Sequence, residues 1–216
     1  MTKILLAFFM LSAFTLKAQP VIKGGLENFV TANNIYPRYS LHHCIQGTVI
    51  ISFKLNKRGE VYYSKISSGI GTDLDDEALR LIRMSSGKWI VPADHDTTVS
   101  LIAPIKFNLS GYDCDNKSPE AIKRAIVAYK TNEGLTNGIL NFYKNKEKGI
   151  YKQDEESRFV ALKNELGYDD EYFKERISDG LKKLKQKDKQ GACEDFLFVK
   201  YMGSDLANEM LEKYCK

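Results

Sequence analysis

The sequence contains few of the residues and motifs on which catalytic and metal sites depend. Its 216 residues include five prolines, four cysteines and three histidines, and no two cysteines form a CxxC pair. Without CxxC there is no support for a thioredoxin-like site or a zinc knuckle. No Gly-rich phosphate loop, GxSxG elbow or HExxH helix occurs either. We therefore predict a non-enzymatic protein without cofactor or metal, and keep an enzyme without a recognisable motif as an alternative.

The three histidines are not expected to form a metal site. His42 and His43 precede the first of three expected strands, whereas His95 precedes the third, at the opposite end of the sheet. A strand of about nine residues separates these two ends by roughly 30 Å. We therefore interpret the histidines as polar surface residues.

Charge of one sign and long apolar runs are also lacking. The chain has 32 basic and 28 acidic residues, and this balance does not point to nucleic acid as a partner. The apolar residues 4–14, after Lys3, would span about 16 Å as a helix, far short of the roughly 30 Å of bilayer hydrocarbon. We expect residues 1–18 to be a cleaved signal peptide that exports the chain to the periplasm. An uncleaved anchor in the inner membrane is the alternative.

The residues after this leader predict a small sheet with two helices. Apolar residues recur at helical spacing in residues 24–36 and again after Asp73. Three segments instead alternate apolar and polar residues, which is typical of strands with one buried face. In the second segment, residues 60–66, the alternation is imperfect because Val61 and Ile66 would point to opposite faces of the strand. This predicts a bulge. The three expected strands are residues 48–55, 60–66 and 99–109.

The connections between these strands fix their order. A tight turn joins the first two, and a helix carries the chain back between the second and the third. A fully antiparallel sheet therefore needs the order 2-1-3, with the third strand at an edge. Pro104 agrees with this, because proline in a sheet is tolerated chiefly at edges. The predicted fold class is α+β, a three-stranded antiparallel sheet with helices on one face in residues 24–113, followed by an all-α helical domain in residues 118–216.

Four cysteines in an exported chain predict two disulfides. Cys44 precedes the first strand and Cys114 follows the third, and antiparallel neighbours bring these two ends together. The last residues are expected to form two antiparallel helices, which places Cys193 beside Cys215. We therefore predict the bridges Cys44–Cys114 and Cys193–Cys215.

The first domain resembles the C-terminal domain of TonB-type energy transducers. The resemblance extends over about 85 residues and depends on the order and spacing of several motifs together. It implies that the edge strand pairs with a short peptide of an outer-membrane receptor, which agrees with the expectation of an open edge. The matching residues are Tyr36-Pro37; Gly47-Thr48-Val49 and Phe53; Gly59 and Val61; Leu74, Ala78 and Leu81; Trp89 and Pro92; and Pro104-Ile105 with Phe107.

The chain departs from such transducers in ways that bear on function. Its leader is expected to be removed, and five prolines are too few for a long proline-rich spacer across the periplasm. Without an anchor the chain cannot pull on a partner. We therefore expect an exported adaptor that binds other proteins, and keep a membrane-anchored component of a TonB-type energy transducer as an alternative.

The end of the chain, residues 187–215, resembles the final unit of tetratricopeptide- or Sel1-like helical repeats. A Gly-Ala step, an aromatic core position and a Met-Gly turn precede the closing helix. The similarity covers about 30 residues and has no clear second copy. Helical arrays of this kind usually bind proteins, which is the same class of function.

The predicted binding site is the outer edge of the third strand, along residues 98–109. Main-chain groups would supply affinity, and the alternate side chains that face solvent rather than the core would supply specificity. The expected partner is a protein or peptide of the cell envelope, with a TonB-dependent receptor as the specific candidate. An edge covered by the chain's own tail would remove the site. The predicted site residues are Ser100, Ile102, Pro104, Lys106 and Asn108.

Overall fold

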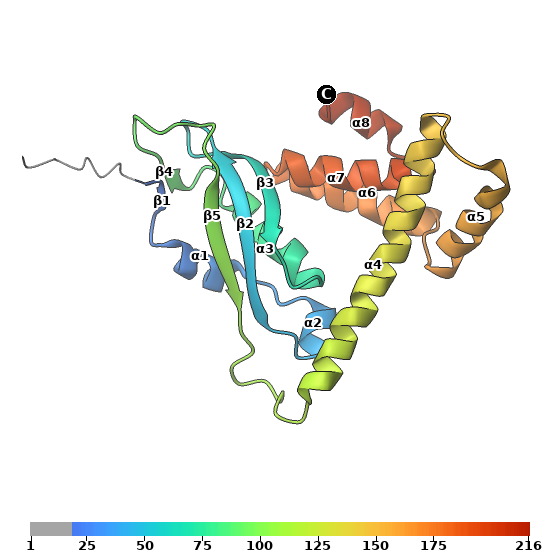
Figure 1. The fold of residues 1–216 in the computed structure, drawn as a ribbon. Helices are drawn as coiled ribbons and strands as arrows, with labels where there is room; N and C mark the ends of the chain where they lie inside the picture. The colour runs from blue at the N-terminus through green and yellow to red at the C-terminus, as the bar shows by residue number, and fades with distance from the viewer. Residues whose placement is uncertain (1–18) are drawn as a thin grey trace, which may run out of the picture.

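The computed structural model describes residues 19–216, so the expected signal peptide lies outside the described residues. An α+β domain stands beside a group of helices, and one long helix runs along both (Figure 1). Within the described part of the chain, no helix is both long enough and apolar enough to cross a membrane.

The sheet has the predicted order and direction. Its three strands are hydrogen-bonded in the order β3-β2-β5, and both pairings are antiparallel. β2 and β5 pair without interruption, from Gly47 opposite Phe107 to Phe53 opposite Leu101. The pairing of β3 with β2 is irregular, as the predicted bulge implies, and its register shifts at two points. The strands are β2 (Gly47–Leu55), β3 (Val61–Ser68) and β5 (Leu101–Phe107).

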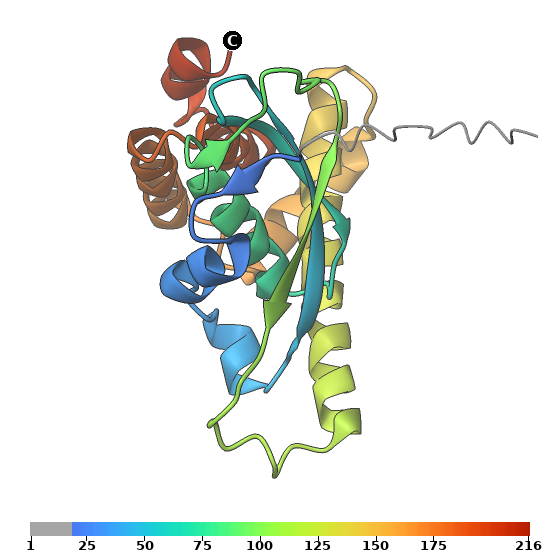
Figure 2. The same cartoon turned by 90° about the vertical axis from the view of Figure 1, so that its left-hand side faces the viewer.

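Three helices cover one face of this sheet, and Figure 2 shows them together on one side of the strands. α3 begins where the Thr72 hydroxyl accepts a hydrogen bond from the Leu74 N–H, and acidic residues occupy its first turn. Sequence patterns did not predict α2, whose five residues are too short for a periodic signal. The helices are α1 (Leu26–Asn33), α2 (Arg38–His42) and α3 (Asp73–Met84).

The core of the α+β domain lies between this sheet face and α3. Alternate residues of β2 and β5 point into it, as the apolar alternation predicts, and meet the apolar stripe of α3. The opposite sheet face carries no helix (Figure 1). The buried core residues include Val49, Ile51, Phe53, Leu55, Leu74, Ala78, Leu81, Ile82, Ala103, Ile105 and Phe107.

A second, two-stranded pairing lies beside the main sheet. β1 (Val21–Ile22) pairs antiparallel with β4 (Trp89–Ile90), so the first described residues lie next to the segment that follows α3. Two-residue strands carry no alternation, and the sequence therefore gave no signal for this pairing.

Helix α4 (Pro119–Glu147) contributes to two hydrophobic cores. It begins at Ser118, whose hydroxyl accepts a hydrogen bond from the Ala121 N–H. Ala125 belongs to the core of the α+β domain, whereas Ile139 belongs to the core of the helical group. One helix thus joins the two parts.

The remaining helices pack around aromatic residues in a core of their own. Phe173 and Phe196 are buried there together with Val199 and Met202. These elements are η1 (Gln153–Glu155), α5 (Glu156–Glu165), α6 (Asp170–Lys185), α7 (Lys189–Tyr201) and α8 (Asn208–Tyr214).

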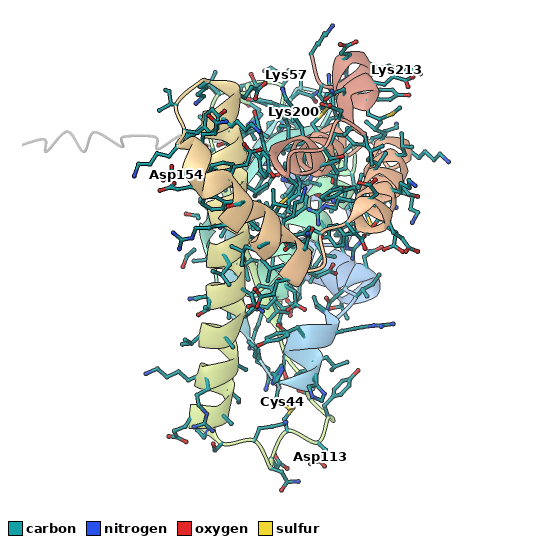
Figure 3. The ribbon with its side chains drawn as sticks, turned by 90° about the vertical axis from the view of Figure 1, so that its right-hand side faces the viewer. Cys44, Lys57, Asp113, Asp154, Lys200 and Lys213 are labelled. Atoms are coloured by element: carbon teal, nitrogen blue, oxygen red, sulfur yellow. A yellow bond between two sulfur atoms is a disulfide. The ribbon has the colours of Figure 1, made fainter. Side chains whose placement is uncertain are left out.

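The cysteines are joined as Cys44–Cys114 and Cys193–Cys215, the pairing expected from the order of elements. Each pair has a Cα–Cα distance of 5.7 Å. Figure 3 shows Cys44 close to the loop that carries Asp113, at the end of the molecule where α4 begins. The first bridge therefore ties the end of α2 to the segment that leads from β5 into α4.

Candidate functional site

The predicted site residues lie along β5 and at its two ends. Ile102, Pro104 and Lys106 are within the strand and are exposed, and 60 % of the Ile102 side chain is accessible. Ser100 and Asn108 are also exposed but flank the strand, because the register with β2 covers only Leu101–Phe107. The strand is therefore shorter than the predicted 99–109.

A contact on β3, the other edge strand, shows in which direction the main-chain N–H and C=O groups of each β5 residue point. The N–H and C=O of Ser64 in β3 both bond to the side chain of Gln190, so this residue faces away from β2. Its partner Phe53 must then direct its main-chain groups towards β5, where it lies opposite Leu101. Because neighbouring residues of a strand alternate in direction, Leu101, Ala103, Ile105 and Phe107 bond to β2, and the residues between them face outwards.

Pro104 supports this assignment independently. Proline has no N–H, so it fits β5 without loss only where that N–H would point away from β2. The open edge therefore offers N–H donors at Ile102 and Lys106 and carbonyl acceptors at Ile102, Pro104 and Lys106. The donors are separated by a gap at the proline.

The two edges of the sheet differ in what covers them. At β3, the Gln190 amide takes both main-chain groups of Ser64 at 2.8 and 2.7 Å, as a neighbouring strand would. Arg83 reinforces the contact, because its guanidinium donates to Ser64 Oγ at 2.9 Å and to both Glu194 carboxylate oxygens at 2.7 and 2.8 Å. The helical group thus occupies the β3 edge at Ser64.

The β5 edge has no such cover among residues 19–216. It is the last strand of its sheet, and no hydrogen bond from the described residues reaches the main chain of Ile102, Pro104 or Lys106. The rival expectation that the tail caps this strand is therefore not met in the described structure, since the tail contacts the opposite edge.

The charged side chains that the strands place on the uncovered face of the sheet are all lysines. Lys54, Lys65 and Lys106 project from the three strands on the face that carries no helix, and no acidic side chain belongs to the strand residues of that face. The Lys54 ammonium lies 6.0 Å from the ring centre of Tyr63. This face would favour a partner with acidic residues beside the strand.

Acidic side chains gather instead where the helical group meets α3. Asp76 and Asp188 lie in this contact, and burial raises the pKa of both carboxyls above the usual range. Arg83 lies 3.9 Å from Asp188, and the nearly inaccessible Asp195 pairs with Arg176 at 2.9 Å and Lys183 at 2.7 Å. These charges fix the helical group against the sheet and lie away from the open edge.

A recess opens beside the first half of β5. Its volume is about 770 Å³, and its walls come from β1, α1 and β5, together with the loop before β5. Sequence reasoning missed this recess, because β1 gives no local signal, and it treated His95 as a surface residue. The apolar lining includes Val21, Ile22, Leu26, Phe53, Trp89, Val99, Leu101, Ile102 and Ala103.

The three histidines lie in two separate places. His42 ends α2 and its ring lies 5.0 Å from that of His43, whereas His95 belongs to the recess. Among residues 19–216 no group of three or more metal-ligating side chains is positioned to hold a metal ion.

Comparison with known proteins gives one similarity, which lies in the α+β domain. Residues 32–109 match the family described as the Gram-negative bacterial TonB protein C-terminal domain. The match excludes β1, the first residues of α1 and all of the helical group. Neither the curated proteins nor the solved structures gave a match. Residues 32–109 are therefore similar to the TonB C-terminal-domain family, whose domains mediate protein interactions.

Proposed function

We propose that this protein is an envelope adaptor that binds an extended segment of a partner as an added strand on β5. The observation that carries the proposal is the difference between the two sheet edges. Gln190 occupies the main-chain groups of Ser64 in β3, whereas the outward donors and acceptors of β5 have no partner within residues 19–216. An unpaired strand edge is a template for strand addition.

The family suggests where the partner is found. Domains of this family belong to proteins of the Gram-negative envelope, so the partner is an envelope protein, with a TonB-dependent receptor as the first candidate. Lys106 on the edge strand, with Lys54 and Lys65 on the same face of the sheet, favours acidic residues in that segment or next to it. Export to the periplasm after removal of residues 1–18 is part of this proposal. A mature N-terminus at Gln19 would support it, and an intact leader would favour the anchored transducer instead.

Replacing Lys106 by proline tests the edge directly. The Lys106 N–H faces outwards, so Lys106→Pro removes a donor from the open edge but leaves the ladder between β5 and β2 intact. We expect this variant to lose capture of envelope proteins that the unchanged protein retains from a detergent extract.

Lys106→Ala is the matched control, because it removes the charge but keeps the N–H. It should retain most of the capture, and both variants should unfold at temperatures close to that of the unchanged protein. Capture that survives in Lys106→Pro would show that the partner uses another surface.

A further inference from the structure

The recess lies where a docked segment would place one of its side chains. Ala103 and Leu101 of β5 form one wall, and Val21 of β1 and Leu26 of α1 contribute to the others. Residues directly opposite each other on neighbouring strands point to the same face of a sheet. A partner residue beside Ala103 therefore projects to the helix-covered face, into the recess.

The residue at position 103 leaves room for such a side chain. The other residues of β5 that face the helices are leucine, isoleucine and phenylalanine, whereas Ala103 has only a methyl group. The apolar walls favour burial of a large hydrophobic group, and the volume of about 770 Å³ exceeds that of one aromatic side chain.

One polar atom in the recess lacks a partner. The Nε2 atom of His95 is buried, and no hydrogen bond within residues 19–216 reaches it. The main-chain N–H of His95 donates to the Pro92 carbonyl at 3.1 Å, which holds the residue in a turn that lines the recess. Buried polar atoms are nearly always paired, so Nε2 indicates a missing donor or acceptor.

We propose that the recess binds a tyrosine side chain of the docked segment, with its hydroxyl on His95 Nε2. A phenol supplies a large apolar ring with a polar tip, and its hydroxyl can both donate and accept, so it fits either protonation state of the imidazole. This proposal rests on the proposed strand addition and adds a side-chain requirement to it. β1 and Leu26 precede the matched residues 32–109, so this wall lies outside the part of the chain that matches the family.

Three synthetic peptides test the requirement. Each has the capped sequence Thr-Val-Thr-X-Thr-Val-Thr, with tyrosine, phenylalanine or alanine at X, and binding is measured by titration calorimetry. We expect the tyrosine peptide to bind about tenfold or more tightly than the alanine peptide, from burial of the ring. It should bind about fivefold more tightly than the phenylalanine peptide, from one added hydrogen bond.

Two variants assign these differences to the recess. His95→Phe should equalise the tyrosine and phenylalanine peptides. Val21→Trp enlarges a half-exposed wall residue so that its ring competes for space in the recess, and it should lower the affinity of both aromatic peptides towards that of the alanine peptide. Neither variant should change binding of the alanine peptide, and circular dichroism confirms their fold.

The outcomes separate the two proposals. Equal binding of all three peptides to the unchanged protein, or a tyrosine preference that persists in both variants, would overturn the recess proposal and leave the edge in place. Failure of the unchanged protein to bind any peptide would overturn strand addition, and the recess proposal with it.

Discussion

Tyr36 shows how a single residue of the family motif fixes the domain. Its hydroxyl donates to the Ile45 carbonyl at 2.5 Å, and its ring meets Phe107 edge-to-face with centroids 6.0 Å apart. It therefore ties the segment before α2 to the segment entering β2 and to the end of β5. Burial, together with the negative charge of Asp73, raises the pKa of Tyr36 to about 12.

This pKa predicts a loss of stability in alkaline solution. An unfolded tyrosine ionises near pH 10, whereas Tyr36 in the folded protein keeps its proton to about pH 12. The folded state thus binds more protons between these values, so stability falls as pH rises from about 10 to about 12. Urea unfolding from pH 8 to 11.5 should show a smaller alkaline loss in Tyr36→Phe than in the unchanged protein. Equal slopes for both proteins would refute this role of Tyr36.

Individual residues also show what sequence patterns can and cannot reveal. Pro104 indicated an edge strand because the chemistry of proline is local. His95 and Gln190 gave no signal, because their surroundings are formed by residues far away in the chain. Gln190 and Ser64, for example, are separated by 126 positions.

At the scale of elements, the hairpin between β2 and β3 depends on one glycine. Gly59 has a φ of +74°, and a Cβ at this position would lie 2.2 Å from the carbonyl oxygen of Trp89 in β4. The Gly87 N–H also donates to the Gly59 carbonyl at 2.8 Å. The turn therefore lies against the segment that follows α3 and leaves no space for a side chain.

Gly59→Ala should lower the free energy of unfolding by more than about 2 kcal/mol, because backbone strain and a steric clash add. Gly149→Ala is a matched control, since Gly149 has a similar φ of +72° but no neighbour within 4 Å of an added Cβ. It should cost only about 1 kcal/mol. Chemical denaturation of both variants measures the difference, and equal costs would show that contact with Trp89 is unimportant.

Elements with a clear period were predictable, and those without one were not. The apolar alternation predicted β2 and β5 as strands, and the apolar stripe predicted α3 as a helix. The order of these elements along the chain then predicted the strand order of the sheet and the pairing of the cysteines. The pairing of β1 with β4 places Val21 opposite Ile90, although the two residues are far apart in the sequence. Only the tertiary structure brings these residues together, so the recess that they help to form could not be predicted.

At the scale of the whole molecule, the helical group contacts β3 at one edge of the sheet, and the open edge, β5, lies at the other. The sequence predicted both parts but not their contact, because the Gln190 and Glu194 side chains of α7 bear no recognisable docking motif. This contact blocks β3 at Ser64 and favours β5 as the site of an added strand. The account therefore depends on the outer edge of β5 being uncovered within the described chain.

Residue-resolved amide hydrogen exchange of the purified protein tests this claim most directly. We predict slow exchange at Ala103 and Ile105, which bond to β2, and fast exchange at Ile102 and Lys106, which face outwards. The Ser64 amide should exchange slowly, because it donates to Gln190. Slow exchange at Ile102 and Lys106 in the free protein would show that something already covers the edge, and would contradict strand addition at β5.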